Sequence, residues 1–301
     1  MSATRELIAR LRRQLGEDEP LAPARPALPL TPPPRRVFPA QRAQTDYLRE
    51  ASQHTTALVG IGHVGTRYAT DIVLQFQAEL AVAHEAVASL LPSAWRREQG
   101  LLPLNSQVVD HEQYLMRPDL GRRLDEESRQ LLMGAALKDV DVQPILADGL
   151  SAKACVESGM SVLSALGSHC TGHGLTLGTP MCARFARVWL EDEIGELVRA
   201  KVAIIILGER PGLGTGDGLS AYLVHRPTVG KTDGDRNMIS NIHRRGLSPE
   251  AAGARLAQMA SAMIEQNSSG VELDLSRIGA EMNSHALRKP ELRESLVESF
   301  R

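Results

Sequence analysis

This chain of 301 residues has few aromatic side chains and no marked excess of either charge. Aromatic residues make up 3% of it, and the formal net charge is −2 with lysine and arginine spread along the sequence. Proteins that bind nucleic acid need a basic surface and use aromatic rings to stack on bases. We therefore expect no nucleic-acid partner.

Cysteine is also scarce, and long apolar runs are missing. The three cysteines, Cys155, Cys170 and Cys182, show no paired spacing, and an odd number fits a reducing compartment. No apolar run approaches the roughly 18 residues of a bilayer span, and no charged-then-apolar leader precedes a cleavage site. These absences predict a cytoplasmic chain that does not cross a membrane. A hydrophobic content of 43% suffices for a sizeable core.

Familiar catalytic motifs are missing as well. The sequence has no Walker loop, no nucleophile elbow and no paired-carboxylate motif. Soft metal ligands occur at His169, Cys170 and His173, but without the second cluster that a zinc site requires. We expect neither a catalytic constellation nor a metal site in this chain.

Composition divides the chain into five segments. We expect an amphipathic helix or tail at 1–19, a proline-rich linker at 20–45, an N-terminal helical region at 46–100, an α/β domain at 101–273 and a C-terminal extension at 274–301. The first segment carries Leu7, Ile8, Leu11 and Leu15 on one helical face. A disordered tail is the alternative, because an isolated helix of this length is marginal in water.

The most informative stretch is an apolar run followed by a glycine-rich loop. Residues 202–207 read VAIIIL, which is typical of a strand buried on both faces, and glycines recur through residues 208–218. Ligands of open α/β sheets bind at the carboxyl ends of strands, where this loop lies. Glu209 and Arg210 could contact a ligand there, or they could pair with neighbours and close the sheet edge.

Strand-like and helix-like segments alternate through the second half of the chain. We expect strands at 142–146, 182–190, 202–207 and 221–224, and helices at 152–166, at 194–200 and after the Ser248-Pro249 cap. This alternation predicts an α/β fold: a Rossmann-like, mainly parallel sheet flanked by helices, with an N-terminal helical extension.

Four acidic residues need an interpretation. Asp148 follows the strand at 142–146, and capping the next helix is favoured over facing a ligand. Glu191, Asp192 and Glu193 are consecutive, and three such side chains are not expected to point inward from one helical turn. We interpret them as a solvated helix start that suits the helix dipole.

A second glycine pattern, GIGHVG at residues 60–65, matches the dinucleotide fingerprint. That fingerprint requires an acidic residue at the end of the next strand, about 20 residues on. Glu79 and Glu85 instead lie within a helical pattern that continues to residue 91. A nicotinamide-dependent oxidoreductase is therefore an alternative hypothesis, and it is not the one that we favour.

Five segments together resemble the small (light) subunit of ethanolamine ammonia-lyase. The most specific are LGERPGLG at 207–214 and DRNMISNIH at 235–243. Supporting segments are YLMRPDLGRRL at 114–124, DGLS at 148–151 and RVWLEDEIGE at 187–196. They occur in the family's order within residues 57–273, which makes chance a poor explanation.

The resemblance implies an adenosylcobalamin-dependent lyase that converts ethanolamine to acetaldehyde and ammonia by a radical route. It implies a hetero-oligomer in which a large subunit, a (β/α)₈ barrel, holds the substrate and reacting groups. The small subunit would then close the other side of the cobalamin and contribute no catalytic residue. A purely structural adaptor is the remaining alternative.

The same resemblance assigns cobalamin contacts to Val188, Glu209 and Met238. We expect Val188 at the end of a strand and Glu209 at the opening of the glycine loop. Met238 stands where a member of the family carries cysteine, so only a contact through backbone or shape would survive there. The resemblance also implies a microcompartment shell as a destination for the amphipathic helix; a contact with the large subunit is the alternative.

Overall fold

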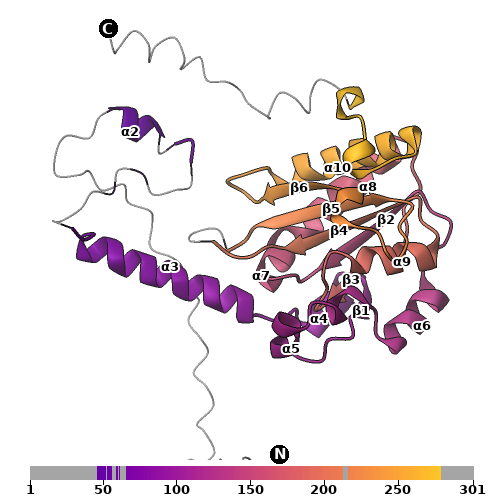
Figure 1. The fold of residues 1–301 in the computed structure, drawn as a ribbon, viewed down its shortest axis with the longest axis horizontal. Helices are drawn as coiled ribbons and strands as arrows, with labels where there is room; N and C mark the ends of the chain where they lie inside the picture. Colours follow the sequence, from indigo (N-terminus) through magenta and orange to yellow (C-terminus); the bar gives the residue numbers. More distant parts are fainter. Residues whose placement is uncertain are drawn as a thin grey trace, which may run out of the picture.

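The computed structural model describes residues 46–51, 53–55, 59, 61, 66–212 and 216–278, which include a six-stranded sheet with helices on both faces (Figure 1). The strands are β1 (Leu102–Asn105), β2 (Val142–Ala147), β3 (Met181–Arg184), β4 (Val202–Gly208), β5 (Leu219–His225) and β6 (Arg236–Ile242). Their spatial order is β1-β3-β2-β4-β5-β6. The predicted α/β class is confirmed.

The sheet is mixed, and the length of each connection explains why. β1, β3, β2 and β4 are parallel, whereas β5 is antiparallel to both β4 and β6. Only residues 209–218 join β4 to β5, and only residues 226–235 join β5 to β6. A parallel crossover needs a dozen or more residues, so these short connections make hairpins. As a result β6 runs in the same direction as β4, and their carboxyl ends lie at one edge of the sheet.

Strand β4 is buried on both faces, as its apolar run predicts. Val202, Ile204 and Ile206 belong to the core beneath helices α8 (Met160–Gly172) and α10 (Pro249–Gln266). Ile205 and Leu207 belong to the core beneath helices α6 (Glu126–Ala135) and α9 (Leu190–Val198). Alternate side chains of a strand point to opposite faces, so a strand covered on both sides requires an unbroken apolar run.

The helices form a layer on each face. They are α2 (Asp46–Ala51), α3 (Thr70–Ala88), α4 (Ser93–Glu98), α5 (His111–Met116), α6 (Glu126–Ala135), α7 (Ala152–Ala154), α8 (Met160–Gly172), α9 (Leu190–Val198) and α10 (Pro249–Gln266). Figure 1 shows α3 extending away from the sheet. No helix in the described ranges is long and apolar enough to span a bilayer.

Short helical turns complete the fold. They are the 3-10 helices η1 (Leu120–Arg122), η3 (Asp233–Asp235), η4 (Gly270–Glu272) and η5 (Leu275–Arg277), and a π-helical turn η2 (Cys155–Gly159) between α7 and α8. Gly159 allows η2 to approach β2, because a Cβ there would lie 2.6 Å from a methyl group of Leu146. The helix predicted at 152–166 is present, and the π-helical turn η2 interrupts it between α7 and α8.

Two other local predictions are confirmed. The Ser248 hydroxyl accepts the amide hydrogen of Ala251 and Pro249 begins α10, as the cap motif predicts. Helix α3 occupies most of the helical pattern that continues to residue 91. Outside the described residues lie the segments 1–19 and 20–45, the GIGHVG pattern at 60–65 apart from Ile61, and residues 279–301.

Asp148 does not cap the following helix, so that interpretation was wrong. Ser151 caps α7 instead, accepting the amide hydrogen of Ala154. The buried Asp148 carboxylate accepts hydrogen bonds from the backbone of Phe185 (2.8 Å) and Ala186 (3.2 Å), beyond the end of β3. It thus ties the carboxyl ends of β2 and β3 together, facing protein and not solvent.

The same contact corrects the bounds of the strand predicted at 182–190. β3 is buried and ends at Arg184. Phe185 has a φ of 54°, which turns the chain, and Asp148 takes the two amide hydrogens that a longer strand would give to its neighbour. Val188 consequently lies in the turn before α9 and not at the end of a strand.

The three consecutive acids are buried, so the solvated helix start was also wrong. The exposed fractions of Glu191, Asp192 and Glu193 are 0%, 2% and 3%. The first two accept hydrogen bonds from the guanidinium of Arg236. Glu193 pairs with Arg129 and accepts the amide hydrogen of Leu124 at 2.9 Å. Partners from two sides of α9 allow all three carboxylates to leave solvent.

Replacing Glu193 with alanine should destabilise the fold substantially. The Leu124 amide would lose its acceptor and Arg129 its carboxylate, which together cost about 2–4 kcal/mol. Urea unfolding of the two forms measures the difference. Glu127→Ala is the control, because Glu127 is exposed in the first turn of α6 and should contribute under about 1 kcal/mol. Equal losses for the two variants would contradict the buried role of Glu193.

Asp148 should give the stability of this protein a distinct pH dependence. Burial raises the pKa of its carboxyl from 3.8 to about 6 in the folded protein. Folding therefore favours the protonated acid, and this contribution is complete below pH 4 and lost as the pH rises through 6. Relative to Asp148→Asn, which cannot titrate here, the parent should lose about 2–3 kcal/mol between pH 4 and pH 7. Parallel pH profiles for the two proteins in chemical denaturation would refute this.

Candidate functional site

A surface cavity of about 370 Å³ lies at the carboxyl ends of β4 and β6. It is lined by Glu209, Arg210, Gly218, Leu219, Ser220, Tyr222, Met238, Ser240, Asn241 and His243. The chain contributes these residues from the loop after β4, the first half of β5, and β6 with the turn beyond it. The cavity therefore brings together two of the residues singled out in the sequence, Glu209 and Met238.

The register of the sheet sets which side chains share this surface. Tyr222 of β5 lies opposite Ile205 of β4 and opposite Met238 of β6. Residues directly opposite each other point to the same face, and Ile205 packs in the core beneath α9. Tyr222 and Met238 thus lie on the α9 side of the sheet. The Met238 side chain is 50% exposed there, so helix α9 does not cover this part of the hairpin.

Glu209 is held at the base of the loop by two hydrogen bonds. Its backbone N–H donates to the carbonyl oxygen of Gly218 at 3.0 Å, and the Tyr222 hydroxyl donates to its Oε1 at 3.0 Å. Burial and the nearby Glu209 carboxylate raise the pKa of Tyr222 to about 12, so the phenol remains a donor at neutral pH. Within the described part of the chain no other group donates to this carboxylate, and its second oxygen is available to accept from a ligand.

The opposite wall contains an asparagine whose amide is oriented by a histidine. His243 Nδ1 accepts the backbone N–H of Arg245 at 3.2 Å, so Nε2 carries the ring hydrogen and donates to Asn241 Oδ1 at 2.7 Å. Burial lowers the pKa of His243, which keeps the ring neutral. Asn241 has a φ of 61°, a conformation that asparagine tolerates. With Oδ1 occupied, the Asn241 amide presents its NH₂ group as a donor.

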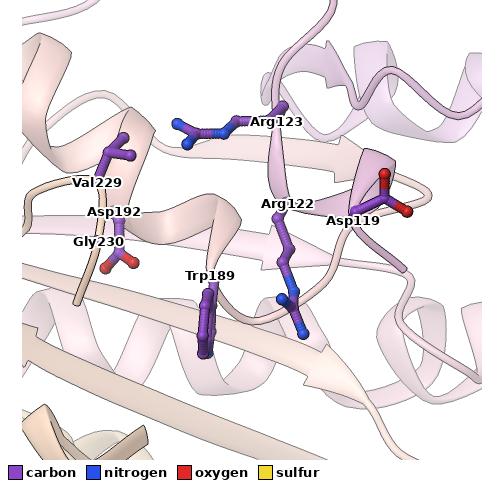
Figure 2. A pocket seen from close by; sticks show the side chains of 7 residues that line it. All are labelled: Asp119, Arg122, Arg123, Trp189, Asp192, Val229 and Gly230. Atoms are coloured by element: carbon purple, nitrogen blue, oxygen red, sulfur yellow. The ribbon is translucent and has the colours of Figure 1, made fainter. Parts of the chain in front are cut away.

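Val188 lies apart from this cavity. It packs against the core beneath α9 in the turn before that helix. Its neighbour Trp189 lines a second cavity, of about 220 Å³, shown in Figure 2. The structure therefore places Val188 on the same side of the sheet as Glu209 and Met238 without placing it in their cavity.

Three site residues escaped the sequence analysis: Tyr222, Asn241 and His243. Tyr222 falls inside the strand predicted at 221–224, but only the register with β4 brings its hydroxyl to Glu209. Asn241 and His243 lie in one of the segments that carry the family resemblance. The sequence signal that could have identified them is the alternation of these two polar residues with the apolar Ile242.

The cavity combines a carboxylate acceptor, an amide donor, an aromatic ring and a thioether. Such a surface suits a large ligand whose edge carries both N–H or O–H donors and carbonyl acceptors. Across the described ranges no group of three or more His, Cys, Asp or Glu side chains could hold a metal ion. The arrangement is that of a binding surface.

Comparison with protein families places these features in one known group. The family model for the ethanolamine ammonia-lyase light chain matches residues 45–274. The match includes all six strands, both cavities and each segment on which the resemblance rests. The chain therefore belongs to the ethanolamine ammonia-lyase light chain family.

Proposed function

We propose that this light chain forms one wall of the adenosylcobalamin site of ethanolamine ammonia-lyase and that the large subunit forms the other. The observation that carries the proposal is the cavity that unites Glu209 and Met238 on an uncovered part of the sheet. A cobalamin is much larger than a cavity of about 370 Å³. The cavity would therefore hold one edge of the cofactor, and a second protein surface must cover the rest.

The residues present fit the chemistry of that cofactor. A corrin ring carries neutral amide side chains, and its nucleotide tail carries ribose hydroxyls and a phosphodiester. Glu209 can accept from amide N–H or hydroxyl groups, and Asn241 can donate to amide carbonyls. Tyr222 and Met238 offer an apolar surface between these two polar groups. When bound, adenosylcobalamin supplies the radical with which the deamination of ethanolamine begins.

Methionine in place of cysteine at position 238 is compatible with this role. Its side chain is half exposed and lies opposite Tyr222, where it can pack against a ligand through its thioether. A contact of this kind depends on shape, and it requires no thiol. We infer that position 238 contributes packing to the cofactor site.

The role of the chain is to bind and position, because its site lacks the partners that acid-base or nucleophilic chemistry needs. The Glu209 carboxylate is paired with a tyrosine hydroxyl, and His243 is engaged by Asn241 and by the Arg245 amide. Neither group is poised beside a nucleophile. The substrate and the reacting groups therefore belong to the large subunit, and the light chain alone should show no turnover.

The decisive experiment uses Glu209→Ala in the reconstituted complex of light and large subunits. Loss of one charge-assisted hydrogen bond should weaken adenosylcobalamin binding about ten- to hundredfold. Equilibrium titration followed by corrinoid absorbance measures this. Saturating cofactor should restore most of the turnover, because the reacting groups lie on the other subunit.

Glu250→Ala is the matched control for this titration. Glu250 is exposed in the first turn of α10, on the opposite face of the sheet, and its loss should leave cofactor affinity unchanged. If Glu209→Ala binds adenosylcobalamin like the parent, the carboxylate is structural and the proposed wall is wrong. Ethanolamine deamination by the light chain alone would show that the reacting groups do not all belong to the large subunit. Nicotinamide-dependent hydride transfer by the light chain would favour the alternative function, an oxidoreductase.

We further propose that the amphipathic segment at residues 1–19 directs the enzyme to a microcompartment shell. The apolar face formed by Leu7, Ile8, Leu11 and Leu15 supports this, because such a face is stable only when docked. Deleting residues 1–40 should leave turnover of the reconstituted complex within about twofold and abolish co-sedimentation with shells in a shell-forming host. A large loss of turnover in vitro would show instead that the segment contacts the large subunit.

A further inference from the structure

The second cavity contains two positive charges that no acid of the described chain neutralises. It is lined by Asp119, Arg122, Arg123, Trp189, Asp192, Val229 and Gly230 (Figure 2). Within the described residues, no carboxylate oxygen lies within ion-pair distance of Arg122 or Arg123.

The acids around the cavity already have partners. Asp119 accepts two hydrogen bonds from Arg117, at 2.7 and 3.0 Å. Asp192 accepts two from the buried guanidinium of Arg236, at 2.6 and 2.8 Å. Since both acids of the lining already accept hydrogen bonds from other arginines, the guanidinium groups of Arg122 and Arg123 are available to a ligand, and an oxyanion is the class that they favour.

Arg122 is positioned in a way that leaves its donors free. Its guanidinium carbon lies 4.1 Å from the centre of the Trp189 ring, and Figure 2 shows the two side chains side by side. Contact with a ring occupies the flat face of a guanidinium, whereas its N–H groups point outward in the plane. The indole is itself fixed, because Trp189 Nε1 donates to Asp233 at 2.7 Å.

The backbone that carries Arg122 is fixed as well. The carbonyl oxygen of Gly121 accepts the amide hydrogen of Arg187 at 2.8 Å. A Cβ at position 121 would lie 2.6 Å from a side-chain carbon of Arg187, so only glycine permits this approach. Arg122 is thus presented by a rigid turn, and little ordering would be required on binding an anion.

This cavity lies close to the proposed cofactor wall. The Arg236 guanidinium carbon is 5.6 Å from the Trp189 ring, and Met238 follows two residues later on the same face of β6. Two residues of a strand span about 7 Å. A cobalamin whose corrin edge contacts Met238 could therefore extend its nucleotide tail toward Arg122.

We propose that Arg122, assisted by Arg123, binds the phosphodiester of the cofactor's nucleotide tail. The inference rests on the proposed function, and it assigns the single anionic group of that tail to the two arginines that line this cavity. Arg122 and Arg123 point in different directions in Figure 2. Arg122, stacked on Trp189, is therefore assigned the direct contact, and Arg123 contributes charge from the cavity rim.

The test compares two corrinoids in the reconstituted complex. Adenosylcobinamide lacks the nucleotide tail and its phosphodiester, whereas adenosylcobalamin has both. Arg122→Gln should weaken adenosylcobalamin binding roughly tenfold and adenosylcobinamide binding less than about twofold. Arg122→Lys, which keeps the charge without the planar fork, should fall between parent and glutamine variant. Arg255→Gln on α10, across the sheet, is the charge-matched control.

The outcomes separate this inference from the proposed function. If Arg122→Gln and Arg123→Gln leave adenosylcobalamin binding unchanged while Glu209→Ala weakens it, only the phosphodiester site is wrong. Equal weakening of both corrinoids also overturns the inference and indicates a contact with the large subunit. If neither arginine variant nor Glu209→Ala has an effect, both proposals fall.

A second measurement decides the matter if the parent complex does not bind adenosylcobinamide. The phosphorus NMR resonance of bound adenosylcobalamin reports on the surroundings of its phosphodiester. We expect Arg122→Gln to shift that resonance and Arg255→Gln to leave it in place. An unshifted resonance in Arg122→Gln would overturn the inference.

Discussion

The candidate site depends on one buried ion cluster, in which Arg236 of β6 binds Glu191 and Asp192 of α9. Their side chains are at most 3% exposed, and the guanidinium donates to Glu191 at 3.0 Å and to Asp192 at 2.6 and 2.8 Å. Burial raises the pKa of Glu191, because it disfavours the ionised carboxylate. The positive charge of Arg236 offsets part of this effect. Removing one member of such a cluster leaves an unpaired buried charge, which costs about 3–5 kcal/mol.

The cluster matters because of what it connects. It fixes the start of α9 against the edge strand of the sheet, and with it Val188 and Trp189, which directly precede that helix. Two residues after Arg236, the same strand carries Met238 into the cavity with Glu209. The ion cluster therefore fixes the position of one cavity relative to the other. A hydrophobic contact could supply the same energy without fixing the orientation as closely.

Local signals predicted the parts of the fold that depend on local physics. The apolar run at 202–207 predicts a doubly covered strand, and Ser248 with Pro249 predicts the start of α10, because each depends on neighbouring residues. The acids of α9 were misjudged, since their burial depends on Arg236 and Arg129, far along the chain. Asp148 was misjudged for the same reason: its hydrogen-bond donors follow a different strand.

The site shows the same division between local and distant information. Glu209 and Met238 were singled out by family resemblance, and the sheet brings them into one cavity. Tyr222 could not be connected to Glu209 without the antiparallel register of β4 and β5. Similarly, the cation on Trp189 comes from residue 122, which no spacing rule relates to residue 189.

We propose that adenosylcobalamin lies on the α9 side of β4, β5 and β6, and hydrogen–deuterium exchange of the assembled complex can locate it there. Adding the cofactor should slow exchange in residues 209–212, 216–222 and 236–243, whereas α8 and α10 on the opposite face should exchange as before. Exchange that is unchanged in these segments, or slowed equally in α10, would show that the cofactor does not lie on this face of the sheet.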